Sequence, residues 1–283
     1  MAWIEVQLKL NQPILEQVSA YLFALGCEGI HIADNKVRIY FLQRNWSDEV
    51  KNALLSYISI FDSAISKRSL HTKALLQRDW NRKWRESFKP LRIGRRITVS
   101  PPWDLSQQHE KDIEIIINPQ MAFGTGHHES TQLILMFMEN FIKPGMKILD
   151  VGTGSGILAF TAKKMGAQQV VGIDTDPQAI KNAMENAILN HVDDTVQFAP
   201  LELKHLNRVE FDIILANINY PVILGLADLF SGYLKDRGLL ILSGILINDE
   251  WGIYNKLADL NYKFIEKSSR KEWLAMVFKK QVA

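Results

Sequence analysis

Three closely spaced glycines beside an aspartate form the pattern in this chain with the clearest chemical use. Residues 148–158 read Ile-Leu-Asp-Val-Gly-Thr-Gly-Ser-Gly-Ile-Leu, which predicts a buried strand, a turn and the start of a helix. A dinucleotide-binding turn has the spacing Gly-x-Gly-x-x-Gly and seats a pyrophosphate on the helix N-terminus. Here Ile157 stands where that third glycine would be, so the turn suits a ligand without phosphate. S-adenosylmethionine is such a ligand, since it needs close backbone approach and a carboxylate partner.

Two acidic residues frame this turn. Asp174 ends the next expected strand, 22 residues after Gly152, and an acid about 20 residues beyond the first glycine accepts hydrogen bonds from a ribose diol. Asp174 could instead cap the helix that begins at Pro177, but Asp176 fits that role better and leaves Asp174 for the ligand. Asp150 could orient the turn or meet the ammonium group of the ligand.

A polar segment, Asn217-Ile218-Asn219-Tyr220, closes another expected strand. Asparagine is common in turns, but an amide and backbone carbonyls at a strand end could also hold a substrate amine. Methyl transfer requires the nitrogen lone pair to align with the carbon–sulfur bond and requires no protein nucleophile, so alignment itself lowers the barrier. The amine must be neutral, which an α-amine of pKa ~7.8 achieves more readily than a lysine of pKa ~10.4.

A second glycine-containing segment, residues 118–131, precedes the first strand of this region. Gly124 and Gly126 indicate a loop that approaches a ligand closely, and Ser130 or Thr131 could cap the following helix or touch the ligand. The His-His-Glu run inside the segment suggests a metal site, but neighbouring side chains diverge and no third ligand has a suitable spacing. We therefore expect no metal.

The elements that position these residues alternate between strands and helices from about residue 113. This order predicts a doubly wound, mostly parallel sheet with its ligands at the carboxyl ends of the strands, where Gly152, Asp174 and Asn217 fall. Expected strands cover 147–151, 170–174, 195–198, 211–217, 239–244, 262–267 and 273–279, and expected helices cover 156–165 and 177–190.

The first third of the chain predicts a separate small α+β domain. Expected strands cover 3–10, 29–33, 36–42 and 64–70, and expected helices cover 13–25 and 48–58, with Ser47 as the cap of the second helix. The order β-α-β-β-α-β is that of a ferredoxin-like unit, a fold that binds proteins, RNA or small ligands. We expect this domain over residues 1–72, a connector over 73–112 and the parallel-sheet domain over 113–283.

The connector region is strongly basic. Residues 67–96 hold 11 Lys or Arg and 2 acidic residues, so the net charge of +2 leaves −7 for the rest of the chain. Such a segment could contact an anionic partner or be a solvated connector, and the pattern leaves both open. Trp80, Trp84 and Phe88 share one helical face, which favours packing on a neighbouring domain over base stacking. A strand is expected at 95–100.

The composition is that of a globular protein. Apolar residues make up 47% of the chain and charged residues 23%, which is typical of a protein with a substantial core. No apolar run approaches the ~18 residues of a membrane span, and the first residues lack the pattern of a signal peptide. Cys27 is the single cysteine, so we expect it to be a small core residue in a protein of the reducing cytoplasm.

Together these motifs resemble the PrmA-type methyltransferases of ribosomal protein L11. The resemblance covers nearly the whole chain and is carried by residues 79–94, 118–119 with 123–126, 149–158 with 172–177, 216–218, 242–246 and 272–273. It implies a class I methyltransferase fold behind a ferredoxin-like substrate-recognition domain and a mobile connector. It also implies transfer of methyl groups from S-adenosylmethionine to lysine side chains and the α-amine of that ribosomal protein.

The resemblance also implies roles for individual residues. The positions that match the family's cofactor contacts are Thr131, Gly152, Asp174 and Asn217, and the neighbouring cofactor-binding candidates are Thr125, Asp150 and Gly154. Asn217 would position the amine, with Phe123 and His128 of the loop beside it. Asn219 replaces the leucine usual in the family and moves the segment toward the Asn-Pro-Pro-Tyr pattern of other amine methyltransferases, and Ser130 replaces a threonine.

Three alternatives stay open. The chain could methylate lysines of another protein. It could methylate an exocyclic amine of RNA, which Tyr220 and the basic segment 67–96 favour, and the same segment could contact ribosomal RNA. It could also be an RNA-binding module with a degenerate methyltransferase fold, which the intact Asp150, Asp174 and Asn217 disfavour.

Overall fold

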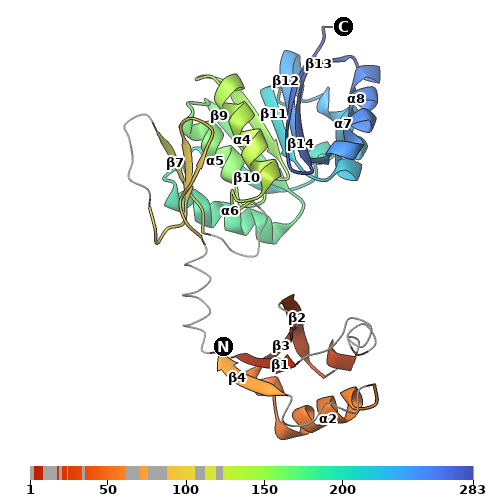
Figure 1. Ribbon diagram of the computed structural model, residues 1–283. Helices are drawn as coiled ribbons and strands as arrows, with labels where there is room; N and C mark the ends of the chain where they lie inside the picture. Colours follow the sequence, from red (N-terminus) through yellow and green to blue (C-terminus); the bar gives the residue numbers. More distant parts are fainter. Residues whose placement is uncertain are drawn as a thin grey trace. The chain divides into compact units, whose positions relative to one another are not determined.

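The chain divides into two compact units, Met1–Ser87 and Phe88–Ala283, in a computed structural model (Figure 1). The structure describes residues 3–8, 18, 21–23, 25–33, 36–61, 70–75, 88–105, 112–118 and 124–282. Within these residues no helix is long and apolar enough to cross a membrane.

The first unit contains a four-stranded antiparallel sheet with the order β2-β3-β1-β4. Its elements are β1 (Trp3–Leu8), β2 (Cys27–Ala33), β3 (Lys36–Leu42), η1 (Gln43–Asn45), α2 (Asp48–Ile58) and β4 (His71–Leu75). The first and third strands lie in the centre, as the ferredoxin-like order predicts. Ser47 caps α2 by accepting a hydrogen bond from the Val50 backbone N–H at 3.3 Å, which confirms that prediction. Cys27 is buried in the core, as expected.

The fourth strand of this unit differs from the prediction. The expected strand 64–70 lies outside the described residues except for Leu70, and β4 occupies His71–Leu75. The expected domain boundary at residue 72 therefore falls inside a strand. The strand is placed by its pairing with β1, from Trp3↔Leu75 to Gln7↔His71, and not by its own apolar pattern. Of the expected helix 13–25, residues 18 and 21–23 are described and helical.

The second unit is built on a seven-stranded sheet with the order β10-β9-β8-β11-β12-β14-β13. Its strands are β8 (Lys147–Val151), β9 (Gln169–Asp174), β10 (Val196–Pro200), β11 (Phe211–Asn217), β12 (Leu234–Leu246), β13 (Tyr262–Arg270) and β14 (Trp273–Lys280). Counted from β8, the order is 3-2-1-4-5-7-6, which is the doubly wound order with one antiparallel strand inserted near the edge. The predicted parallel sheet and its closing strand pair are confirmed.

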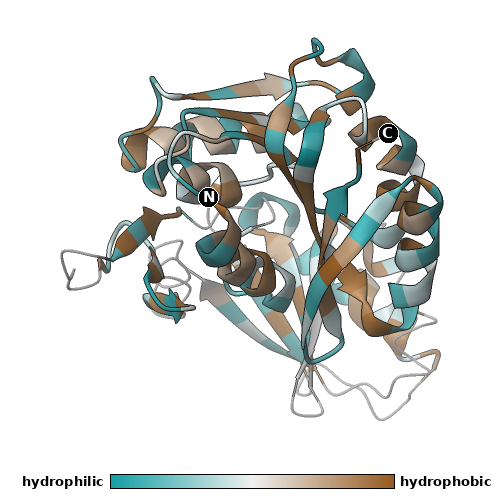
Figure 2. Cartoon of the chain, turned by 90° about the horizontal axis from the view of Figure 1, so that it is seen from above, coloured by the Kyte–Doolittle hydropathy of each residue, from teal (hydrophilic) through white to brown (hydrophobic). Residues whose placement is uncertain are grey.

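Helices cover both faces of this sheet (Figure 1). They are α4 (Glu129–Phe141), α5 (Ile157–Lys164), α6 (Pro177–Leu189), α7 (Tyr220–Phe230) and α8 (Glu250–Asp259), with short turns η2 (Leu203–His205) and η3 (Ile247–Asp249). Successive residues of β11 face opposite sides, so Ile213 and Leu215 pack in one core with residues of α4 and α5, while Ile214 and Ala216 pack in the other with α7 and α8. Figure 2 shows apolar residues along these strands.

A third sheet, β5-β6-β7, was not expected as a unit. Its strands are β5 (Leu91–Ile93), β6 (Ile97–Ser100) and β7 (Ile113–Ile116). The sequence predicts a strand at 95–100 but places it in a connector. The structure pairs it in parallel with β7, so residues 88–105 belong to the second unit and not to a separate connector.

Two buried asparagines at the C-terminal end of α6 hold β7 and the residues after it to the second unit. Asn190 donates from Nδ2 to the Ile116 carbonyl at 2.6 Å, and its Oδ1 accepts the Ile116 N–H at 2.9 Å. One turn earlier, Asn186 accepts the Asn118 N–H at 3.0 Å and donates to the Ser155 carbonyl at 3.1 Å. The segment that leads into the loop before α4 is therefore tied to the glycine turn.

Replacement of Asn190 by alanine should lower the free energy of unfolding by about 1–3 kcal/mol, because the backbone N–H and carbonyl of Ile116 both lose their partner. Urea denaturation measures this. The matched control is Asn255→Ala on the exposed side of α8, which should stay within about 0.5 kcal/mol of the wild type. Equal stabilities of the two variants would contradict the role of Asn190.

Candidate functional site

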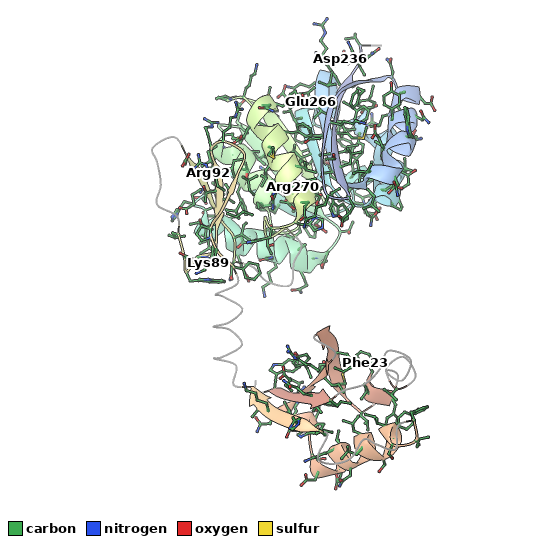
Figure 3. The ribbon with its side chains drawn as sticks, in the orientation of Figure 1. Phe23, Lys89, Arg92, Asp236, Glu266 and Arg270 are labelled. Carbon is green, nitrogen blue, oxygen red and sulfur yellow. The ribbon has the colours of Figure 1, made fainter. Side chains whose placement is uncertain are left out.

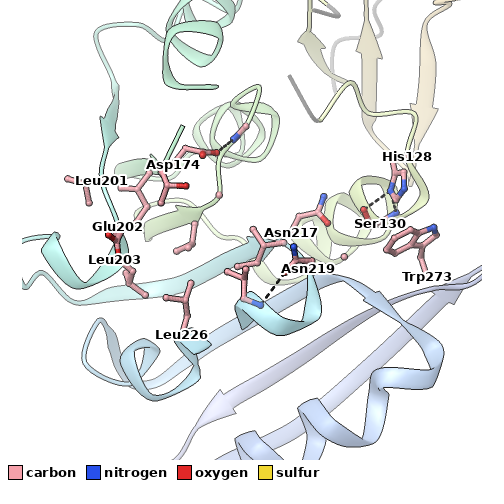
Figure 4. A pocket seen from close by; sticks show the side chains of 18 residues that line it. His128, Ser130, Asp174, Leu201, Glu202, Leu203, Asn217, Asn219, Leu226 and Trp273 are labelled. Carbon is pink, nitrogen blue, oxygen red and sulfur yellow. Dashed lines mark hydrogen bonds between the residues drawn. The ribbon is translucent and has the colours of Figure 1, made fainter. Parts of the chain in front are cut away.

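A cavity of about 640 Å³ lies at the carboxyl ends of β8, β9 and β11 (Figure 4). Gly152, Asp174 and Asn217, which the sequence places at those strand ends, all line it. In Figure 4, Asp174 and the segment 201–203 lie at one end, His128 and Trp273 lie at the other, and Asn217 lies between them. The volume is within the range of about 300–1,000 Å³ that is usual for small-ligand sites.

The glycine turn has a backbone that side chains rarely adopt. Gly152, Gly154 and Gly156 have φ of 73°, 54° and 86°, in the left-handed region that glycine enters without steric cost. The N–H groups of Gly152 and Thr153 both donate to the Ile173 carbonyl at 2.9 Å. These bonds fix the turn against β9, with Gly152 and Gly154 at the cavity.

Asp174 holds the turn as well as facing the cavity. Its Oδ2 accepts the Gly154 N–H at 3.0 Å, and its Oδ1 accepts the Asp176 N–H at 3.0 Å. Asp174 thus receives two backbone donors that the sequence did not predict, while its role toward a ligand stays a prediction. A carboxylate has further lone pairs for a ligand. Asp176 accepts the Gln178 N–H at 2.8 Å and caps α6, as predicted.

Asp150 lies behind the turn. It is fully buried and does not line the cavity, and the Thr153 hydroxyl donates to its Oδ2 at 2.6 Å. Of its two predicted roles, this geometry supports orientation of the turn and not contact with the ligand. Burial raises the pKa of the Asp150 carboxyl to about 7, with the negative charge of Asp174 adding to the rise and the hydrogen bond from Thr153 opposing it.

Asn217 lines the cavity between its two ends and carries one unpaired, buried acceptor. Its Nδ2 donates to the Thr131 hydroxyl at 3.1 Å, while its buried Oδ1 has no hydrogen-bond partner. Thr131 is fully buried and does not line the cavity, so it orients Asn217 and does not itself reach a ligand there. An unpaired buried carbonyl oxygen is costly, and a donor from the cavity would remove that cost.

Ile218 fixes the position of the Asn217–Asn219 segment between two glycines. A Cβ on Gly152 would lie 2.3 Å from Ile218 Cγ2, and a Cβ on Gly244 would lie 2.5 Å from the Ile218 carbonyl oxygen. Gly244, at φ 79°, is the last residue of the predicted strand 239–244 and lies within β12. Only glycine permits these two close contacts. The cavity wall therefore depends on the packing of Gly152 after β8, Ile218 after β11 and Gly244 in β12 against one another.

The structure assigns positions to the two residues that follow Ile218, of which Asn219 departs from the family pattern. Asn219 caps α7 by accepting the Val222 N–H at 3.2 Å, a role for which asparagine is favoured over leucine. The Tyr220 hydroxyl lies against Gly252 of α8, and Tyr220 does not line the cavity. Tyr220 therefore gives no support to base recognition in this cavity.

His128 and Trp273 form the wall opposite the segment 201–203. His128, and not Ser130 or Thr131, caps α4: its Nδ1 accepts the Ser130 N–H at 3.3 Å and lies 2.7 Å from the Ser130 hydroxyl oxygen. The rings of His128 and Trp273 meet edge-on, with centroids 4.6 Å apart. Sequence reasoning assigned no role to Trp273 or to residues 201–203, because no local pattern shows that β14 begins and β10 ends at this cavity.

Part of the predicted loop lies outside the described residues. Phe123 is in that part. Gly124 is described, and its carbonyl accepts the Ser155 hydroxyl at 2.7 Å, which ties the loop to the glycine turn. Thr125 does not line the cavity. Among the described residues no cluster of His, Cys, Asp or Glu could hold a metal.

Two arginines of the basic segment 67–96 are engaged with the second unit. Arg92 pairs with Asp112 at 2.8 Å, and the Arg95 guanidinium lies 3.6 Å from Glu139 (Figure 3 labels Arg92). These contacts favour the solvated-connector interpretation for these two arginines. Residues 76–87, with Trp80 and Trp84, lie outside the described residues.

The raised pKa of Asp150 predicts a pH dependence of stability. Between about pH 4 and 7 the folded state keeps this carboxyl protonated while the unfolded state ionises it, so stability falls as pH rises through that window. Asp150→Asn should reduce this decrease in the free energy of unfolding by on the order of 1–4 kcal/mol. Urea denaturation at pH 5 and pH 8 measures it, with the exposed Asp193→Asn as the control. A wild-type pH profile in the Asp150 variant would contradict the buried-carboxyl account.

Comparison with known proteins agrees with this architecture. The family model described as "Ribosomal protein L11 methyltransferase (PrmA)" matches residues 2–281. The chain is 33% identical to the ribosomal protein L11 methyltransferase of Caldanaerobacter subterraneus subsp. tengcongensis, over 99% of this chain and 100% of that protein. It is 32% identical to that of Caldicellulosiruptor saccharolyticus, with 99% and 100% covered.

A solved structure shows the same likeness. The crystal structure of a ribosomal protein L11 methylase from Lactobacillus delbrueckii subsp. bulgaricus matches with a TM-score of 0.65 and 29% identity, over 69% of this chain and 100% of that one. The match of the family model across nearly all residues, with full-length relatives above 30% identity, shows that the chain belongs to the family of ribosomal protein L11 methyltransferases.

Proposed function

We propose that this protein transfers methyl groups from S-adenosylmethionine to amine nitrogens of ribosomal protein L11, both lysine side chains and the α-amine. The observation that carries the proposal is the unpaired Oδ1 of Asn217 in the cavity wall. It is a hydrogen-bond acceptor without a partner, placed beside a glycine turn suited to this methyl donor. The names of the relatives supply the identity of the acceptor protein.

The cavity fits S-adenosylmethionine in three respects. The left-handed Gly152 and Gly154 let the ligand approach the backbone. Asp174, already oriented by two backbone N–H groups, has lone pairs for the ribose hydroxyls. The apolar side chains of Leu201 and Leu203 line the same end of the cavity and suit a flat base. S-adenosylmethionine supplies an electrophilic methyl group when bound.

The opposite part of the cavity would hold the amine. Asn217 Oδ1 accepts an N–H of the neutral amine and thereby orients the nitrogen lone pair. Ile218 and Trp273 provide apolar surface around this acceptor, and desolvation there favours the neutral amine over the ammonium form. No protein nucleophile is needed, so alignment and the exclusion of water are the contribution of the protein.

The remaining predicted residues take supporting roles in this proposal. Thr131 orients Asn217, Asp150 supports the glycine turn, and His128 positions Trp273. Phe123 and Thr125 remain loop candidates whose contacts with donor or acceptor are predictions. We assign recognition of the ribosomal protein to the first unit and place the reaction in the cytoplasm, where ribosomal proteins are made. Contact of residues 67–96 with ribosomal RNA also remains a prediction.

The function is tested with radiolabelled S-adenosylmethionine and three acceptors: purified ribosomal protein L11, protein-free ribosomal RNA and an unrelated lysine-rich protein. We expect label in the ribosomal protein alone. Label in the RNA alone would contradict the proposal and support the RNA alternative. Label in the unrelated protein at an equal rate would indicate a general lysine methyltransferase.

Asn217→Ala should slow methyl transfer by on the order of 100-fold, because the amine loses its orienting acceptor. Binding of S-adenosylmethionine, measured by calorimetry, should change only a few-fold. Asn207→Ala is the matched control, because Asn207 is exposed and does not line the cavity, and it should stay near the wild-type rate. Losses of equal size in transfer and in cofactor affinity would reassign Asn217 to cofactor binding.

A further inference from the structure

An apolar surface borders the amine side of the cavity. Its side chains come from the end of β12, from η3 and from the first turns of α7 and α8. We call it the rim patch, and it consists of Val222, Leu246, Ile247, Trp251 and Tyr254. Trp251 is 70% exposed, and large exposed aromatic groups are characteristic of protein-binding surfaces.

The core does not require the indole of Trp251. The inward face of α8 is already filled by Ile253 and Leu257, which are buried. Trp251 lies on another face and meets the ring of Tyr254 edge-on at a centroid distance of 5.8 Å. The indole therefore leaves a large apolar area exposed to water and does not pack in the core. Such an exposed area indicates a binding partner outside the chain.

The rim patch is continuous with the cavity. Val222 belongs to both. Leu246 pairs in register with the cavity residue Trp273, and the Ile247 N–H donates to the Glu272 carbonyl at 2.9 Å. The contact of Tyr220 with Gly252 brings the first turn of α8, which contains Trp251, against the first turn of α7.

The distance between the acceptor amine and the backbone that carries it determines which residues of the acceptor protein contact this surface. An α-amine is bonded directly to its own Cα, and a lysine amine sits on a four-carbon stem. A protein that places either nitrogen beside Asn217 must bring its backbone to the mouth of the cavity. The surface bordering that mouth is then in contact with the residues that flank the acceptor.

We propose that the rim patch binds apolar residues of ribosomal protein L11 that flank the methylated amine. This inference rests on the proposed function and adds a second contact to it, outside the cavity. Trp251 is the central anchor, because a large aromatic ring buried at an interface contributes more than its neighbours. The contact contributes to binding of the acceptor protein and not to binding of the methyl donor.

The test compares Trp251→Ala and Ile247→Ser with controls of the same kind on α6. Met184→Ala and Ile188→Ser replace exposed apolar side chains that lie on a helix packed against β9 and β10. For each full-length variant, KM for the ribosomal protein, kcat and affinity for S-adenosylmethionine are measured. We expect the Trp251 variant to raise KM about tenfold, with kcat and donor affinity unchanged, which is the signature of lost binding common to ground and transition states.

An unchanged KM in both rim variants would overturn the inference while leaving the proposed function intact, provided that the wild type methylates the ribosomal protein. A rise in KM of equal size in the α6 variants would overturn it too, because the effect would then follow from any exposed apolar residue. Failure of the wild type to methylate the ribosomal protein would overturn the proposed function, and the rim assignment with it.

Discussion

The close contact of Ile218 with two glycines is the constraint on which the rest of the site depends. Gly152 begins the turn after β8, Gly244 lies in β12, and Ile218 follows β11 between them. Interiors are packed too densely to absorb an added methyl group at such distances. Because the three strand ends are locked together here, the glycine turn and the segment that carries Asn217 keep a single relative position.

Because of this contact, the glycine turn, which we propose binds the methyl donor, and Asn217, which we propose holds the amine, lie in one wall of the cavity. The glycine turn is held from the other side by Ile173 and Asp174, and Asn217 is held by Thr131 of α4. The amide nitrogen of Asn217 is therefore used by the protein, and its oxygen has no hydrogen-bond partner; we propose that the acceptor amine supplies one. A group whose orientation is set in advance loses little entropy when the ligand binds, which is how such a site can accelerate a reaction that needs alignment alone.

The sequence predicted the parts of this structure that depend on local patterns. The strands β8 and β11 and the helix α2 have the expected bounds, because apolar runs and a serine cap mark them directly. The short strands β5 and β7 were missed, since α6 holds β7 through Asn190, far away in the chain. Trp273 as a wall of the cavity was missed for the same reason, since its place comes from tertiary contacts. His128 caps α4 through a local bond from the Ser130 N–H, and it was missed because histidine is not among the residues favoured at helix N-caps.

The most direct test of the central claim is a double-mutant cycle between Gly152→Ala and Ile218→Ala, measured as the free energy of unfolding by urea denaturation. If the methyl group of the new alanine meets Ile218, trimming Ile218 makes room for it. The account predicts that the double variant loses less stability than the two single variants combined, by about 0.5–3 kcal/mol. Strictly additive losses would contradict it, because Gly152 and Ile218 would then contribute to the site independently.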